Sequence, residues 1–138
     1  MTSRRLAVDV GNTDTSWALF DPNMNPLAVG RCSSRSWFND PPPPPPDPWR
    51  TATDIVVSSV LRGVPDALLA VLNACAPGRA YVFPDDIPSP IPVEISRPEQ
   101  VGADRISAAV GARERLRMQG YLDCGPIIIA AGTAMTVA

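Results

Sequence analysis

A short acidic turn between two apolar runs near the amino terminus constrains this chain more than any other feature. The run Leu6-Ala7-Val8 leads into Asp9-Val10-Gly11-Asn12-Thr13, and Thr15-Ser16-Trp17-Ala18-Leu19-Phe20 follows. This pattern predicts a buried strand over 5–10 and its hairpin partner over 15–20. Gly-Asn is common in the turns of ordinary hairpins, so the turn by itself is also compatible with a purely structural role.

The same turn has the chemistry of a phosphate-binding loop. Gly11 permits a close approach of the backbone. The N–H groups of the turn and the side chains of Asn12 and Thr13 can bind phosphate oxygens, and Asp9 can hold Mg2+ directly or through water. A nucleotide triphosphate suits this combination, but a motif of this length is a hypothesis until its context agrees.

Three further segments supply that context. Pro98-Glu99 precedes Val101-Gly102-Ala103-Asp104-Arg105, the stretch Ala131-Gly132-Thr133-Ala134-Met135-Thr136 lies near residue 138, and the apolar run 55–60 contains the paired serines Ser58-Ser59. In this order the motifs resemble type III pantothenate kinase, a family of the actin, hexokinase and acetate-kinase superfamily. The resemblance covers the whole chain but only about the first half of a family member. Each motif is weak alone, and their order and spacing carry the resemblance.

The resemblance implies an α/β fold. We expect a ribonuclease-H-like (actin-like ATPase) domain, with a mixed sheet and flanking helices, over 1–98, and the connecting helix and first hairpin of a truncated second domain over 99–138. The implied activity is ATP-dependent phosphorylation of pantothenate to 4'-phosphopantothenate, the first step of coenzyme A biosynthesis. ATP, Mg2+ and a monovalent cation (K+ or NH4+) are the implied cofactors, and a homodimer is the implied assembly.

Matching the motifs residue by residue gives a candidate site. Asp104 matches the family's general base, although its position alone would favour a simple helix N-cap. Arg105 can bind a carboxylate bidentately, which suits pantothenate, whereas the alternative is a surface helix charge. The expected pantothenate-binding segment is Gly102, Ala103, Asp104 and Arg105. The expected ATP and phosphate contacts are Asp9, Val10, Gly11, Asn12, Thr13, Asp14, Thr15, Ser16 and Thr133, with Asp9 as the candidate Mg2+ ligand.

Two positions depart from the family pattern. Ala130 stands where the family carries an aspartate that, by the resemblance, binds the monovalent cation, and Ala138 stands where a second aspartate is usual. A methyl group cannot ligate K+ or organise Mg2+, so we expect the cation site to be lost and transition-state stabilisation to be weakened. The alternatives to an active kinase are a non-catalytic kinase-like regulatory protein, analogous to a transcription accessory factor, and a decayed fragment.

Composition excludes several other classes. The net charge of −2 provides no basic surface for nucleic acid, and the absence of histidine excludes a histidine base or metal ligand. No apolar run approaches the roughly 20 residues of a membrane helix, and the amino-terminal run is too short for a signal peptide. Cys32, Cys75 and Cys124 are odd in number and far apart, so we expect reduced thiols in a cytoplasmic protein.

The rest of the pattern predicts the remaining elements. Strands are expected over 27–32, 55–60, 80–83, 91–95 and 127–131, with 133–137 as the last hairpin partner. Helices are expected over 65–74 and from 99 or 104 to 118, the second closed by Gly120. The six prolines from Pro41 to Pro46 cannot form a helix or a central strand. We interpret 40–48 as an extended surface loop insertion, and the alternative is a docking ligand for an SH3 or WW domain.

Overall fold

A five-stranded mixed sheet forms the centre of the protein. The computed structural model describes residues 2–121, 123, 125–127, 129–131 and 135–137. The strand order is β3-β2-β1-β4-β5, with β2 antiparallel to both of its neighbours and with β1, β4 and β5 parallel. The strands are β1 (Arg5–Val10), β2 (Asp14–Phe20), β3 (Pro26–Ser33), β4 (Asp54–Ser59) and β5 (Ala80–Val82).

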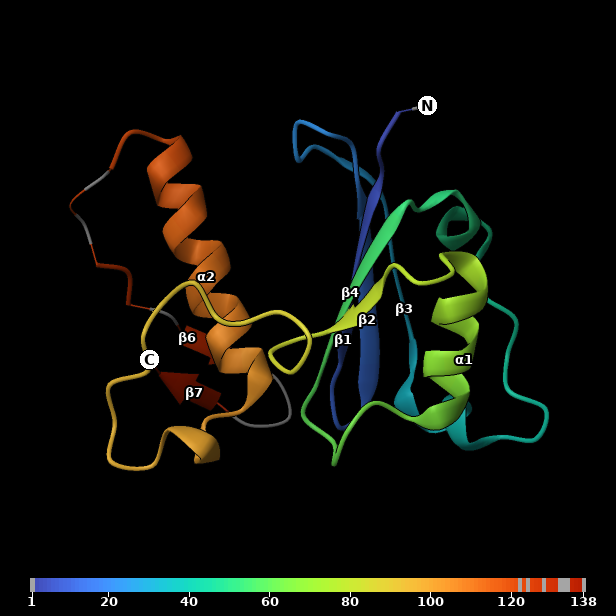
Figure 1. Cartoon of the computed structure of the whole chain (residues 1–138). Helices are drawn as coiled ribbons and strands as arrows, with labels where there is room; N and C mark the ends of the chain where they lie inside the picture. The colour runs from blue at the N-terminus through green and yellow to red at the C-terminus, as the bar shows by residue number, and fades with distance from the viewer. Residues whose placement is uncertain (1, 122, 124, 128, 132–134, 138) are drawn as a thin grey trace.

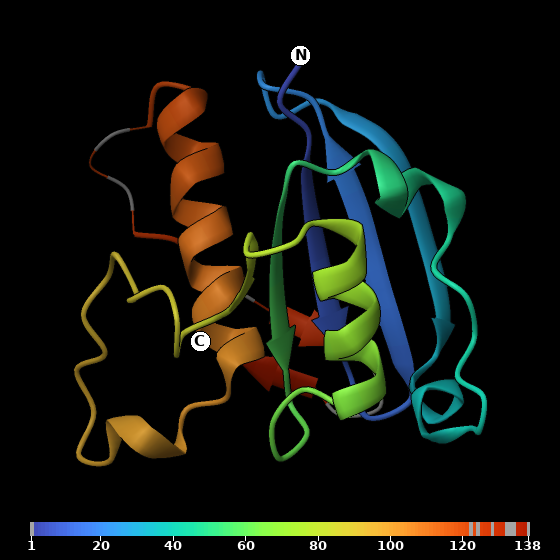
Figure 2. The same cartoon turned by 45° about the vertical axis from the view of Figure 1, so that its right-hand side comes forward.

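Two helices lie on opposite sides of this sheet, α1 (Asp66–Cys75) on one and α2 (Ala103–Met118) on the other (Figure 1). Beside α2, the strands β6 (Ile129–Ala131) and β7 (Met135–Val137) pair into a small antiparallel sheet of their own, as both views show (Figure 2). Within the described part of the chain, neither helix has the length and apolar character needed to cross a membrane.

The hydrophobic core lies between the sheet and α1. Successive side chains of a strand point to opposite faces, so Leu6, Val8 and Val10 of β1 share one face, and each is at most 3% exposed. Leu68 and Leu72, one helical turn apart on α1, are fully buried in the same cluster. This alternation sends the other side chains of β1 to the sheet face on the α2 side.

The proline segment is a loop that two buried tryptophans anchor at its ends. It connects the 3-10 turns η1 (Ser34–Phe38) and η2 (Asp47–Thr51), and Pro41–Pro46 form neither helix nor strand, as predicted. Trp37 of η1 and Trp49 of η2 are at most 2% exposed, and their rings stack with centroids 6.0 Å apart. The loop is therefore tied to the core at both ends, a feature that the prolines alone do not predict.

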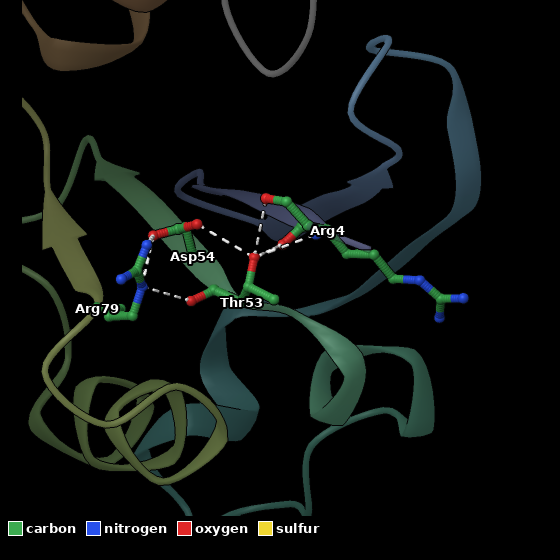
Figure 3. Close-up of polar contacts among 5 residues, drawn as sticks. Arg4, Thr53, Asp54 and Arg79 are labelled. Atoms are coloured by element: carbon green, nitrogen blue, oxygen red, sulfur yellow. Dashed lines mark hydrogen bonds and ion pairs between the residues drawn. The ribbon is translucent and has the colours of Figure 1, made fainter. Parts of the chain in front are cut away.

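A group of polar contacts fixes the register of β1 and β4 at their amino ends (Figure 3). The backbone N–H of Arg4 donates to the Thr53 hydroxyl at 3.1 Å, and that hydroxyl donates to the Arg4 carbonyl at 2.9 Å. Arg79, just before β5, donates from Nε to the Thr53 carbonyl and to Asp54 Oδ1. A shift of one residue in the β1–β4 register would turn every side chain of the shifted strand to the opposite face of the sheet. By fixing the register, these contacts also determine which residues lie opposite each other at the carboxyl ends of the two strands.

Most of the predicted elements are confirmed. The strand β1 has its predicted bounds, and β2 to β5 and α1 differ from prediction by at most one residue at either end. The long helix α2 begins one residue before the later of its two predicted starts, ends at Met118 as predicted, and is followed by Gly120 with φ +88°. Within 127–131 and 133–137, the structure shows β6 and β7, whereas residues 128, 133 and 134 lie outside the described residues.

The strand predicted over 91–95 was wrong, because the structure has no strand there. The Ser89 side chain occupies both backbone groups of Ile91: it accepts from the amide at 3.2 Å and donates to the carbonyl at 2.8 Å. Pro90 and Pro92 have no N–H with which to pair. The hydrogen bonds from Ser89 and the missing backbone N–H groups of the prolines therefore prevent strand pairing here, despite the alternating apolar pattern.

Candidate functional site

The candidate site begins where the carboxyl ends of β1 and β4 lie side by side. The parallel register places Asp9 opposite Ser58, whose Oγ donates to Asp9 Oδ1 at 3.2 Å. The pairing continues past β4, since the Val60 amide donates to the Val10 carbonyl at 3.0 Å. Asp9 projects from the face of β1 opposite its core side chains, and the residue as a whole is exposed.

The turn after β1 is clamped from two sides. The Gly11 amide donates to the Asp14 carbonyl at 2.9 Å, and a Cβ at position 11 would lie 2.9 Å from that same oxygen, so the turn requires glycine. From η1, the Ser34 amide donates to the Thr13 carbonyl at 2.9 Å and its hydroxyl donates to the Gly11 carbonyl at 2.8 Å. A turn with a fixed shape is what preorganised anion binding needs.

Two of the predicted phosphate contacts are fully buried. Val10 and Thr15 are both 0% exposed, so neither side chain reaches solvent. The Thr15 hydroxyl lies 3.0 Å from Ser34 Oγ and accepts a hydrogen bond from Trp37 Nε1 at 3.2 Å. Within this structure Thr15 supports the turn from the core side, and Val10 offers only its backbone.

The other predicted phosphate contacts lie nearer the surface. Asn12 at the tip of the turn is exposed, and so is Ser16, which is paired with Asp9 across the β1–β2 ladder and shares its face. Asp14 is half-buried and lies 3.9 Å from the Arg31 guanidinium. These side chains surround the solvent-facing end of β1, whereas Thr133 lies outside the described residues.

The amino end of α2 brings the second predicted motif to the same place. Gly102 is the N-cap, Ala103 begins the helix, and Asp104 lies in its first turn. The Asp104 carboxylate folds back over Gly102. Its Oδ1 is so close that a Cβ built on residue 102 would lie 2.5 Å from it. Arg105 is exposed and has no ion-pair partner among the residues that the structure describes.

Asp9 and Asp104 are close enough to interact electrostatically. The pKa of Asp9 is raised, chiefly because neighbouring protein removes water from its carboxylate; the Ser58 hydrogen bond works against this, and the negative charge of Asp104 adds to it. The fold therefore brings Asp104 within electrostatic range of Asp9, although the two residues are 95 positions apart in the sequence. Paired carboxylates of this kind often mark functional sites.

The Asp9 carboxylate has the chemistry to hold a divalent cation. Mg2+ prefers oxygen ligands and commonly uses one or two carboxylates together with water and substrate phosphates. Among the described residues there is no cluster of three or more His, Cys, Asp or Glu, so most ligands would come from water and substrate. Position 130 does not fit a monovalent cation through its side chain, since alanine has no side-chain oxygen.

The candidate site residues named from the sequence did not include Ser58 and Ser34, which shape the surroundings of Asp9 and the turn. Ser58 donates to Asp9, and the signal for it was present, since the paired serines end an apolar strand that could pair with β1. Ser34 clamps the turn through its amide and hydroxyl, and nothing in the sequence marks it among several serines. Its role depends on the three-dimensional return of β3 to the turn.

Replacing Asp9 with asparagine is expected to stabilise the fold at neutral pH. Because the folded pKa lies above the unfolded value near 4, folding penalises the carboxylate at higher pH, and the penalty disappears as the pH falls below that value. The melting temperature of D9N should exceed that of the parent by about 1–2 °C at pH 7. The shift is small because Asp9 is an exposed residue and solvent screens part of the effect.

Thermal melts followed by circular dichroism at pH 7 and pH 3 test this prediction. Ser58→Ala is the matched control, because losing the hydrogen bond that lowers the Asp9 pKa should destabilise the chain at neutral pH. A D9N variant that is less stable at pH 7, or whose advantage grows on acidification, would contradict the assignment of the raised pKa.

Comparison with known proteins gives a consistent result. Residues 5–138 match the family model described as type III pantothenate kinase. The chain is 35% identical to the type III pantothenate kinase of Acidovorax ebreus (strain TPSY), over 96% of this chain and 52% of that protein. It is 32% identical to the type III pantothenate kinase of Maricaulis maris (strain MCS10), over 95% of this chain and 52% of that protein. The chain therefore spans about half the length of the curated relatives it matches.

Proposed function

The chain belongs to the type III pantothenate kinase family, and from this premise we propose that it carries the phosphate turn and the pantothenate-binding segment of an enzyme that phosphorylates pantothenate with ATP. The observation that carries the proposal is the clamped glycine turn that follows Asp9 at the end of β1. The helix α2, with Asp104 in its first turn, packs against β4, the neighbour of β1. The order β3-β2-β1-β4-β5 supports a ribonuclease-H-like first domain.

The turn after β1 is proposed to hold the phosphates of ATP. Gly11 lets the backbone approach them closely, and the clamp from Ser34 fixes the turn before any ligand arrives. Asn12 and Ser16 offer exposed polar side chains at the same end of the sheet. Asp9 is proposed to hold Mg2+, which supplies neutralisation of the phosphate charge when it is bound.

The start of α2 is proposed to bind and activate pantothenate. Arg105 is exposed, so it is free to pair with the carboxylate of the substrate. Asp104 is proposed to accept the proton of the primary hydroxyl as its oxygen forms a bond to the γ-phosphorus, while the bond to the β,γ-bridging oxygen breaks and ADP leaves. By family resemblance, we further propose that a homodimer is the working assembly.

A second candidate function is nucleotide binding without phosphoryl transfer. The observation that favours it is Ala130, which lacks the side-chain oxygen that a monovalent cation site would require. The two candidates share the phosphate turn and differ only in turnover, so one experiment separates them.

The experiment is ADP release by the whole chain with ATP, Mg2+ and K+, with and without pantothenate, alongside ATP binding measured by calorimetry. Release that depends on pantothenate is the expected result. Saturable ATP binding without release would support the non-catalytic candidate instead. A chain that circular dichroism shows to be folded, but that neither binds ATP nor releases ADP, would contradict both candidates.

A further inference from the structure

A hollow lies beside the turn after β1, on the α1 side of the sheet. It has a volume of about 320 Å³ and lies between the tip of the turn, η1 and the loop that connects β4 to α1. Its lining consists of polar, cationic and apolar groups from those three segments: Asn12, Ser34, Arg35, Phe38, Leu61, Arg62, Gly63 and Pro65. We propose that this hollow, here called the arginine pocket, binds an aryl phosphate monoester independently of the nucleotide site.

The charge of the arginine pocket points to an anionic ligand. Arg35 and Arg62 are exposed, and within the described residues neither makes an ion pair. Among the described residues that line the pocket there is no Asp or Glu, although the chain as a whole has a net charge of −2. Guanidinium groups bind phosphate bidentately, so two of them at one hollow favour a phosphate group.

The walls of the arginine pocket point to an apolar body on that ligand. Phe38 is 70% exposed, although its neighbour Trp37 is buried in the core. Leu61 and the buried Pro65 contribute the other apolar surface. Ligand sites typically combine an apolar lining with a few polar groups that fix orientation, and a flat aromatic ring can stack on both Phe38 and a guanidinium.

The arginine pocket is separate from the proposed nucleotide site. Asp9 lies on the face of β1 opposite its core side chains, whereas the pocket is lined by η1 and by Pro65, the N-cap of α1, both of which belong to the core side. The two sites share only the turn, through Asn12 at its tip and through Ser34, which clamps it. Independent binding therefore requires that both sites can be filled at the same time.

Phenyl phosphate is the probe for this proposal, with binding to the whole chain measured by calorimetry at low salt. Saturable binding is expected, and Arg35→Gln and Arg62→Gln should each weaken it roughly tenfold, because each removes a charge-assisted contact. Arg115→Gln, at an exposed site on α2, is the matched control and should leave the affinity unchanged. Equal losses in all three variants, or no saturable binding, would overturn the proposal.

Two further arms test the apolar wall and the independence of the sites. Inorganic phosphate should bind roughly fivefold or more weakly than phenyl phosphate, and Phe38→Ser should remove that difference, because the ring loses its stacking partner. Saturating ATP should leave phenyl phosphate binding in place. Displacement by ATP, together with an equal loss of ATP affinity in Arg35→Gln and Arg62→Gln, would show that the pocket belongs to the nucleotide site and would overturn the proposal of a separate one.

Discussion

Replacing Asp104 with asparagine is expected to lower pantothenate-dependent ADP release by about 10²–10⁴-fold, the usual contribution of a general base. Asparagine has nearly the same shape, so the helix start over Gly102 should persist, but its amide cannot accept the proton of the substrate hydroxyl. The variant also removes a negative charge that acts on Asp9, so the pKa of Asp9 should fall towards its ordinary value. The release assay measures the first effect, and a carboxylate NMR titration measures the second.

Glu114→Gln is the matched control for this prediction. Glu114 lies on the same helix α2, its side chain is 52% exposed, and its contact with Arg117 is a surface ion pair of the kind that contributes little. It should leave turnover and the Asp9 titration unchanged. Turnover retained by Asp104→Asn would refute the assigned base, and an unchanged Asp9 titration would refute the proximity of the two carboxylates.

The sequence predicted those parts of the fold that short-range patterns determine. The hairpin of β1 and β2 follows from apolar alternation around a Gly-Asn turn, and the end of α2 follows from Gly120, which has a positive φ two residues after Met118. The places of Asp9 near the end of β1 and of Asp104 in the first turn of α2 were also readable, because each stands two residues from a glycine, whereas their roles stay predictions. The division at residue 98 and the roles of Thr133 and Ala130 stay predictions.

The remaining features depend on long-range packing, which local patterns do not encode. Ser34 clamps the turn only because β3 returns beside it. Asp104 influences Asp9 electrostatically only because α2 packs against β4, the neighbour of β1. The proline segment reads locally as a solvated insertion, but the tryptophans at its ends are buried. The wrong strand prediction over 91–95 has a local cause instead: the hydrogen bonds from the Ser89 side chain to Ile91 prevail over the apolar alternation.

Replacing Trp49 with alanine is expected to destabilise the chain by about 3–5 kcal/mol, the range for losing a large aromatic side chain from a core. Trp49 is 0% exposed, its ring stacks on Trp37, and it meets Trp17 edge-on at 85°. A domain of this size has only about 5–15 kcal/mol of total stability, so the variant should unfold at much lower urea concentration. Urea titration followed by circular dichroism measures this, because fluorescence would change with the loss of an indole.

Trp49→Phe separates the cavity from the polar group. Trp49 Nε1 is buried without a hydrogen-bond partner among the described residues, which is unfavourable, and phenylalanine removes that group while keeping an aromatic ring in the stack. The smaller ring leaves a smaller cavity, so this variant should lose much less stability than Trp49→Ala. Phe38→Ala, which removes a ring that is 70% exposed, should change stability by at most about 0.5 kcal/mol. If Trp49→Ala were as mild as Phe38→Ala, the loop 39–46 would not be anchored through the core.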